Sequence, residues 1–157
     1  MGSIWSQTCS IGRRPPLRGH LKTQAAVVGA GMAGVLTAYA LQQAGLSVVV
    51  LEAGRIAGGQ TQNTTAKITS QHGLIYSRLI QSFGEETARR YAKANQDAVR
   101  AYQDLIDVQG ISCDWEERCA YLYGPDVTVL QEEAEAARRL GLAGLVHQGG
   151  LYPHPPR

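Results

Sequence analysis

The stretch that most constrains the fold is residues 25–52, where a glycine-rich turn separates a predicted strand from a predicted helix. Ala25–Val28 is a short run of small and β-branched residues, which is typical of a buried strand. The next six residues, Gly29–Gly34, read GAGMAG and fit the pattern G-x-G-x-x-G. Apolar residues then recur at helical spacing over Val35–Ala44. This order predicts a strand, a tight turn and a helix, which is how a βαβ unit begins.

The remainder of this stretch completes the predicted unit. Gly45 stands where a helix C-terminal glycine is expected. Leu46–Leu51 is a second β-branched run, and Glu52 stands at its end. Dinucleotide binding is indicated by the whole order of strand, glycine turn, helix, second strand and acid. The glycine pattern alone would be weak support. The alternative is a glycine-rich turn in an unrelated α/β domain.

Each glycine in the turn has its own physical role. Gly29 permits the tight turn out of the strand, Gly31 lets a pyrophosphate approach the backbone, and Gly34 lets the helix pack closely on the strands. The helix N-terminus presents N–H groups and the positive end of its dipole to the phosphates. The carboxylate of Glu52 can accept hydrogen bonds from both hydroxyls of an adenosine ribose. The predicted cofactor-binding residues are therefore Gly29, Ala30, Gly31, Met32, Ala33, Gly34 and Glu52.

A long polar loop, residues 53–67, follows the acid and contains adjacent glycines and several hydroxyl and amide side chains. One interpretation is a flexible surface loop. The interpretation that we favour is a second wall of the cofactor site, whose hydroxyls and backbone N–H groups face phosphate and ribitol oxygens. The position of the loop directly after the acid supports this second interpretation. The cofactor-binding residues predicted in it are Gly59, Thr61, Thr65 and Lys67.

Together these motifs resemble one branch of the flavoproteins. GAGMAG, Glu52 and the loop sequence GGQTQNTTAK are similar to the glutathione-reductase-type branch that contains the D-amino-acid oxidase-like, FAD-dependent oxidoreductases. The continuation TTAKITSQHGLIYSRLIQSFGEE is similar to bacterial members with a C-terminal Rieske iron–sulfur domain. The resemblance runs from about Ser3 to about Gly144, and the family's covalent-flavin and Rieske cysteine–histidine motifs are not in this chain. It implies FAD as the cofactor and oxidation of an amine or amino acid by hydride transfer to the flavin.

The composition is that of a globular chain of 157 residues, long enough for one modest domain, with 44% hydrophobic and 18% charged residues. Its net charge of +2 is too small to indicate nucleic-acid binding. Arg13 and Arg14 precede an apolar stretch that is explained by the strand, turn and helix and is too rich in glycine for a membrane span. We therefore expect a cytoplasmic protein with neither a targeting segment nor a membrane span.

Cysteine and histidine spacings favour neither disulfides nor a metal site. Cys9, Cys113 and Cys119 form no C-x-x-C pair, and their odd number favours free thiols in a reducing compartment. A bridge between Cys113 and Cys119 across a hairpin is the alternative. The four histidines show no metal-ligand spacing: His20, His72, His147 and His154.

Two helices are predicted directly after the loop. Gly73–Phe83 has apolar residues at helical spacing, and Ser82 with Glu85 has capping-box spacing for the helix that follows. Glu85–Val108 is the second helix, which Gly110 ends. Apolar residues three or four positions apart form a stripe along it that we expect in the core: Tyr91, Ala94, Ala98, Tyr102, Leu105 and Ile106.

A hairpin and a last helix follow. Ile111–Tyr123 predicts two short strands around a charged tip, because Ile111, Cys113 and Trp115 alternate with polar residues before the tip and Ala120–Tyr123 is an apolar and aromatic run after it. The acids Asp114, Glu116 and Glu117 could suggest a general acid or a metal site, but a charged hairpin end explains them better. Val127–Leu140 predicts a helix that begins at Asp126 or Thr128 and stops at Gly141.

The predicted fold class is α/β, a Rossmann-like FAD-binding half with the start of a mixed α+β substrate domain. An extended lead-in, 1–24, precedes the N-terminal part of the dinucleotide-binding domain, 25–110, and we expect Ile4 and Trp5 to dock on that domain. The substrate domain begins over 111–144, and an irregular tail follows over 145–157. A frame change around Gly144–Val146 would explain the tail.

The resemblance implies a small-molecule amine or amino acid as substrate and a separate electron acceptor, with the flavin carrying the chemistry. We predict no catalytic side chain. Lys67 is the only candidate near the flavin end of the loop, and a phosphate-binding or structural role is favoured. Two other classes stay open: an NAD(P)-binding enzyme with the same first motif, and a non-catalytic truncated product or binding module. We expect the chain to be inactive as an oxidase by itself.

Overall fold

The computed structural model describes residues 3–143, and their contacts form two units, the first ending at Lys67 and the second beginning at Ile68. This division falls within the domain predicted over 25–110, and the sequence-based domain boundaries stay predictions. The irregular tail predicted for 145–157 lies outside the described residues. No helix in the described part of the chain is both long and apolar enough to cross a membrane.

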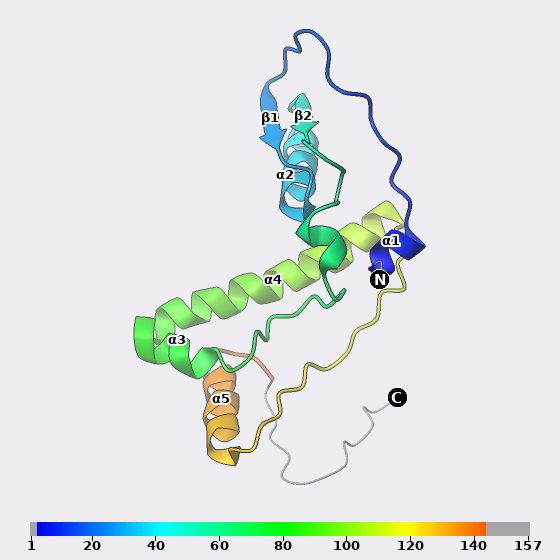
Figure 1. Cartoon of the computed structure of the whole chain (residues 1–157). Coiled ribbons are helices and arrows are strands. Elements are labelled where there is room, and N and C mark those ends of the chain that lie inside the picture. The colour runs from blue at the N-terminus through cyan, green and yellow to red at the C-terminus, as the bar shows by residue number, and fades with distance from the viewer. Residues whose placement is uncertain (1–2, 144–157) are drawn as a thin grey trace. The chain divides into compact units, whose positions relative to one another are not determined.

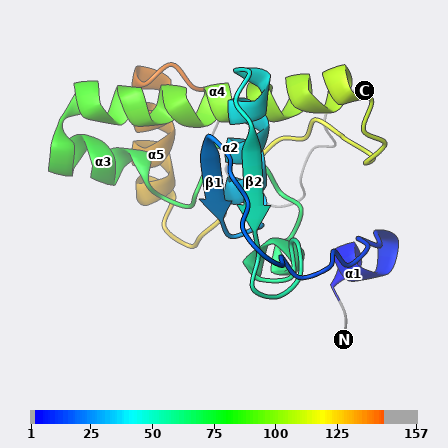
Figure 2. The same ribbon diagram turned by 90° about the horizontal axis from the view of Figure 1, so that it is seen from above.

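The first unit contains a parallel βαβ arrangement. β1 (Ala25–Val28) and β2 (Val48–Leu51) pair in parallel, in a register that runs from Ala25 opposite Val48 to Val28 opposite Leu51. α2 (Met32–Gln43) connects the strands and contacts both of them, as Figures 1 and 2 show. The predicted first strand is confirmed, and the second begins slightly later than the predicted Leu46–Leu51.

α2 is bounded by glycines at both ends. It begins within the glycine motif, at Met32 rather than at the predicted Val35, and Gly31 is its N-cap. The Val35 N–H donates to the Gly31 carbonyl over 3.0 Å, which is the first hydrogen bond of the helix. At the other end Gly45 has φ 84°, and its N–H donates to the Gln42 carbonyl over 2.9 Å. The predicted C-terminal glycine is thus confirmed, because this left-handed conformation is one that glycine adopts without strain.

Two short helical segments complete the first unit and contact each other: α1 (Ile4–Thr8) and the 3-10 helix η1 (Gln60–Asn63). The prediction of a wholly extended lead-in is wrong at α1, where the Ser3 hydroxyl accepts a hydrogen bond from the Ser6 N–H over 3.3 Å and caps the helix. Ile4 is 60% exposed, so its predicted docking is wrong. Trp5 is half-buried, and its docking is confirmed.

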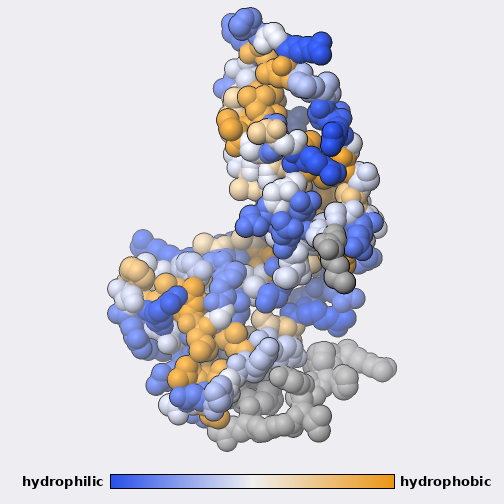
Figure 3. Space-filling view, in the orientation of Figure 1, coloured by the Kyte–Doolittle hydropathy of each residue, from blue (hydrophilic) through white to orange (hydrophobic). Residues whose placement is uncertain are grey.

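The second unit packs three helices together: α3 (Tyr76–Phe83), α4 (Glu85–Gln109) and α5 (Val127–Arg139). α3 contacts both of the others, and in Figure 3 apolar side chains gather over α3 and α5. Tyr76 is fully buried, donates its hydroxyl hydrogen to the Ser70 carbonyl and meets the ring of Tyr91 edge-on. The buried core of this unit is Tyr76, Ala88, Ala92, Ala136, Ala137 and Leu140.

The predicted apolar stripe of α4 joins the core only at its start, where the half-buried Tyr91 packs against the buried cluster, and is wrong as a core beyond that point. The fully buried residues of α4 are Ala88 and Ala92, whereas Ala94 and Ala98 of the stripe are exposed. α3 has 8 residues and α4 has 25, so α3 covers only the first part of α4. The later stripe residues Tyr102, Leu105 and Ile106 are only half-buried for the same reason.

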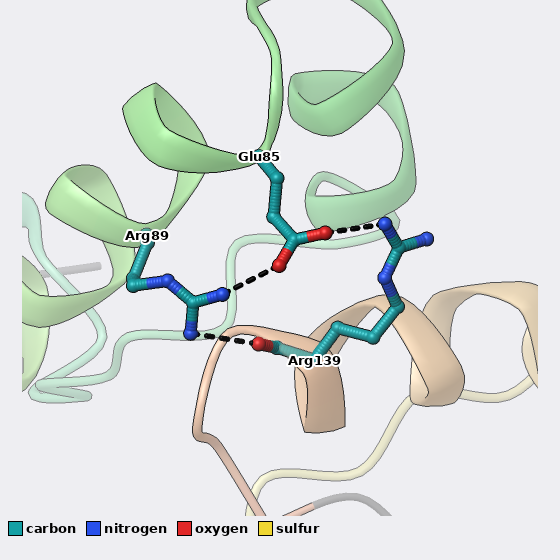
Figure 4. Close-up of polar contacts among 3 residues, drawn as sticks. All are labelled: Glu85, Arg89 and Arg139. Atoms are coloured by element: carbon teal, nitrogen blue, oxygen red, sulfur yellow. Dashed lines mark hydrogen bonds and ion pairs between the residues drawn. The ribbon is translucent and has the colours of Figure 1, made fainter.

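α4 begins at Glu85 as predicted, but its cap differs from the prediction. Gly84, with φ 79°, is the N-cap and makes no side-chain cap, so the predicted capping box of Ser82 and Glu85 is wrong. Glu85 instead lies in an ion-pair cluster between α4 and α5 (Figure 4). Its carboxylate accepts from Arg89 over 2.5 Å and from Arg139 of α5, and the Arg89 guanidinium also donates to the Arg139 carbonyl over 2.9 Å.

Glu133 determines where α3 begins. This side chain lies on α5 and is 3% exposed. Its Oε1 accepts from the N–H groups of Ile75 and Tyr76, both over 2.9 Å, and its Oε2 accepts from the Ser77 N–H over 2.9 Å. The helix therefore begins at Tyr76 rather than at the predicted Gly73, because an acid from another helix satisfies its first donors.

The hairpin predicted over Ile111–Tyr123 is absent from the described structure, where this segment is irregular. Two strands alone are marginal without a third strand or a helix to pack on, and Tyr121 and Tyr123 are 52% and 82% exposed. Cys113 and Cys119 are free and exposed, as is Cys9, so the alternative of a bridge is wrong.

The start of α5 confirms its prediction. The Asp126 carboxylate accepts from the N–H groups of Thr128 and Val129, over 2.9 Å and 3.3 Å, as an N-cap residue does. Gly141, with φ 88°, follows the helix as predicted.

Candidate functional site

The glycine turn lies at the carboxyl end of β1, between the strand and α2. Gly29 has φ 99°, which side chains rarely allow, and its N–H donates to the Leu51 carbonyl over 2.7 Å. A Cβ added to Gly34 would lie 1.9 Å from the Gly29 carbonyl oxygen. The expected close packing of this helix position is therefore confirmed, and only glycine fits at 34.

The N-terminus of α2 faces the polar loop. Its N-cap, Gly31, has no side chain to cap the helix. The Thr61 hydroxyl of η1 takes that place and accepts from the Met32 N–H over 2.9 Å. A Cβ at Gly31 would meet Thr61 Oγ1 at 3.4 Å and no other atom within 4 Å, so the space before the turn is open. A helix N-terminus of this kind attracts phosphate groups.

Glu52 lies beside the same turn because of the parallel strand register. Its Oε2 accepts from the Ala30 N–H over 2.8 Å, and its Oε1 accepts from the Gly54 N–H over 2.8 Å. These hydrogen bonds, the one from Ala30 foremost, lower the pKa of Glu52 from its ordinary 4.5. The carboxylate is therefore ionised at neutral pH. It is also exposed, and each of its oxygens retains a lone pair for a ligand.

Ala30 joins the turn to both the acid and the loop. It is 2% exposed, and its carbonyl accepts from the Ala57 N–H over 2.9 Å. Ala57 has φ 55°, which is unusual for a residue with a Cβ. No residue pattern in the sequence signals Ala57, since an alanine gives no sign of left-handed backbone.

The loop contributes one side chain to the turn. Thr61 is half-buried at the start of α2. The other predicted loop residues Gly59, Thr65 and Lys67 are exposed, and within the described part of the chain no hydrogen bond joins them to the turn. Of the residues predicted to bind a cofactor, the structure thus brings together those of the glycine motif with Glu52 and Thr61.

The assembled groups suit a ligand that carries both phosphates and a diol. The N–H groups in the first turn of α2 have no acceptor within the helix and lie at the positive end of its dipole. They belong to Met32, Ala33 and Gly34. Glu52 places a negative acceptor on the other side of Ala30. One end of a dinucleotide has both groups, a phosphate that the amides can bind and a pair of ribose hydroxyls that the carboxylate can bind.

Comparisons with known proteins agree with this geometry. A family model described as DAO, FAD dependent oxidoreductase, matches residues 24–150. The chain is similar to the Rieske 2Fe-2S iron-sulfur protein YhfW of Bacillus subtilis (strain 168). The two are 36% identical over 143 residues, and the matched region is 89% of this chain. It is 32% identical over 155 residues, 91% of the chain, to the tRNA 5-methylaminomethyl-2-thiouridine biosynthesis bifunctional protein MnmC of Ectopseudomonas mendocina (strain ymp).

A third relative is the gamma-glutamylputrescine oxidoreductase of Escherichia coli (strain K12), 28% identical over 117 residues, or 73% of this chain. The matched parts span 28%, 23% and 28% of the lengths of these three relatives. No solved structure matches the chain significantly.

Proposed function

The chain belongs to the family of FAD-dependent oxidoreductases, and from this premise we propose that its first unit binds the ADP part of FAD at the glycine turn. The observation that carries the proposal is the hydrogen bond between Glu52 and Ala30, at 2.8 Å. It supports the proposal because it holds a carboxylate, the group that would accept from the ribose, beside the turn whose amides would hold the pyrophosphate.

The residues of the turn fit this ligand. Gly31 leaves the approach to the backbone open, and Met32, Ala33 and Gly34 supply helix N-terminal amides. The Thr61 hydroxyl accepts from the Met32 N–H and can at the same time donate its own hydrogen to a phosphate oxygen. Gly59, Thr65 and Lys67 remain proposed contacts of the more distant part of the cofactor.

The reaction is proposed from the relatives, because the chain spans only about a quarter of their length. When bound, a flavin accepts a hydride from a substrate carbon. The name of the E. coli relative, an oxidoreductase of a putrescine derivative, supports a small amine or amino acid as substrate. Residues from Ile111 onward are proposed to begin the substrate domain. This chain's own contribution is to bind and orient the cofactor.

A cytoplasmic location is part of the same proposal. Cys9, Cys113 and Cys119 are all free and exposed, as thiols are in a reducing compartment.

The second candidate is NAD(P) binding at the same turn, because the glycine motif and an acid at the second strand serve both cofactors. Calorimetric titration of the 157-residue chain with FAD, ADP and NAD separates them. We expect FAD and ADP to bind. A chain that binds NAD but not FAD would overturn the assignment.

Gly31→Val tests the turn itself. The added side chain would occupy the approach to the backbone, so we expect no measurable heat with FAD, while helix content stays unchanged. Gly12→Val is the matched control, because a Cβ at Gly12 meets no atom within 4 Å. Retained FAD affinity in Gly31→Val would show that the cofactor binds elsewhere.

A further inference from the structure

The N-terminal segment of the chain is hydrogen-bonded to the loop that caps α2. The indole N–H of Trp5 donates to both oxygens of Thr64, the carbonyl over 3.1 Å and the hydroxyl over 3.0 Å. These residues lie 59 positions apart in the sequence. α1, which carries Trp5, also contacts η1. α1, which precedes the βαβ unit, therefore contacts and hydrogen-bonds to the loop that follows the unit.

The hydrogen bonds continue from Thr64 to the start of α2. The Thr64 hydroxyl donates to the Thr61 carbonyl over 3.2 Å. The Thr61 hydroxyl in turn accepts from the Met32 N–H over 2.9 Å. One hydroxyl can accept from Trp5 and donate to Thr61 at once, so Thr64 connects the two residues. It leads from Trp5 to the first amide of the helix at which the phosphates are proposed to bind.

We propose that Trp5 is a positioning residue of the dinucleotide site, which holds η1 and thus Thr61 against the N-terminus of α2. The inference rests on the proposed function, since it assigns Trp5 to that site. A polar loop with two adjacent glycines, Gly58 and Gly59, has many conformations, and ordering it on binding would reduce affinity. Trp5 removes part of that cost by ordering the loop before the ligand arrives.

The first test needs no ligand. Trp5→Phe keeps an aromatic ring on the loop and removes the indole donor. We expect hydrogen exchange of the Met32 amide, measured by NMR on the full chain, to become about three- to tenfold faster. The Gly29 amide, bonded to the Leu51 carbonyl over 2.7 Å in the same unit, should be unaffected. Unchanged Met32 exchange, or equal acceleration of both amides, would overturn the positioning role.

The second test measures binding. Trp5→Phe should weaken ADP binding about three- to tenfold by calorimetry, the effect of one hydrogen bond. Trp115→Phe is the control, since Trp115 lies in the second unit, and it should bind ADP as the parent does. Equal affinity of Trp5→Phe and the parent refutes the positioning role alone. A parent chain without ADP affinity refutes the proposed function, and the exchange experiment then decides the role of Trp5.

Thr64→Val tests the same path from the side of the loop, and it replaces Trp5→Phe if that variant does not fold. It removes the hydroxyl that Trp5 and Thr61 share and preserves the shape of the side chain. Faster exchange at Met32 supports the path, and unchanged exchange overturns it.

Discussion

Replacing Glu133 by alanine should destabilise the second unit more than any replacement on its surface. The carboxylate is 3% exposed and accepts four hydrogen bonds. Three come from the main-chain N–H groups of Ile75, Tyr76 and Ser77, and one comes from the Gln71 side chain over 3.0 Å. The alanine variant removes all four acceptor contacts and leaves the first turn of α3 without its cap.

The expected loss follows from the burial of the donors. A buried donor without a partner costs about 1–3 kcal/mol. Tyr76 is fully buried, whereas Ile75 and Ser77 are half-buried, so water can restore part of their hydrogen bonding. We therefore expect a loss of about 3–5 kcal/mol in the free energy of unfolding, a large part of the stability of a typical domain.

Urea denaturation followed by far-UV circular dichroism measures this loss. Glu133→Gln retains one carbonyl oxygen for Ile75 and Tyr76 but turns an amide NH2 towards another donor, so it should lose only about 1–2 kcal/mol. Glu132→Ala, an exposed neighbour on the same helix, is the matched control and should change stability by less than about 0.5 kcal/mol. If Glu133→Ala is as stable as Glu132→Ala, the carboxylate does not hold the start of α3.

Two further predictions concern the carboxylates of Glu52, which is exposed, and Glu85, which is half-buried. Glu52→Ala should weaken ADP binding about 10- to 100-fold by calorimetry, because two charge-assisted bonds to the ribose are lost; parental affinity would exclude Glu52 as the ribose ligand. Hydrogen bonding and charge from Arg139, followed by Arg89, lower the pKa of Glu85 from its ordinary 4.5. The ionised Glu85 therefore stabilises the folded state fully above pH 4.5, and this stabilisation disappears as the pH falls through the lowered pKa. The difference in urea midpoint between the parent and Glu85→Gln should be constant above about pH 5 and shrink below it; a gap that does not change with pH would refute the ion pair's contribution.

Local patterns predicted the βαβ part of the first unit well, because the residues that define each of its elements are close in sequence. β1, the glycine turn and the glycine that follows α2 were each predicted from residue types in a short window of the sequence. The start of α2 was predicted too late, at Val35, because Met32–Gly34 were assigned to the turn alone. In the structure the last part of the motif is both turn and first helical turn.

The second unit could be predicted less well, because its arrangement depends on contacts between distant helices. The apolar stripe of α4 is amphipathic by sequence, but α3 covers only the first part of that helix. A window of one helix cannot show where the partner helix ends. The strands predicted over Ile111–Tyr123 failed for a related reason, since alternation indicates a strand only where a sheet exists to receive it.

The burial of Glu133 has a signal in the sequence. It lies three positions after Leu130 and four before Ala137, on the face of α5 that packs against the core. A charged residue on such a face must have partners, because an unpaired buried charge is costly. Three of those partners are backbone N–H groups, which no side-chain pattern reveals.

The position of Glu52 shows how strand register determines the candidate site. The ladder runs to Val28 opposite Leu51, and the Gly29 N–H extends it with one more bond to the Leu51 carbonyl. The residue after Leu51 then lies beside the residue after Gly29, which places the acid on the Ala30 N–H. Because successive side chains point to opposite faces of a strand, a shift of one residue would direct the acid away from the turn. The pairing that ends the sheet therefore also places the carboxylate that we propose binds the ribose.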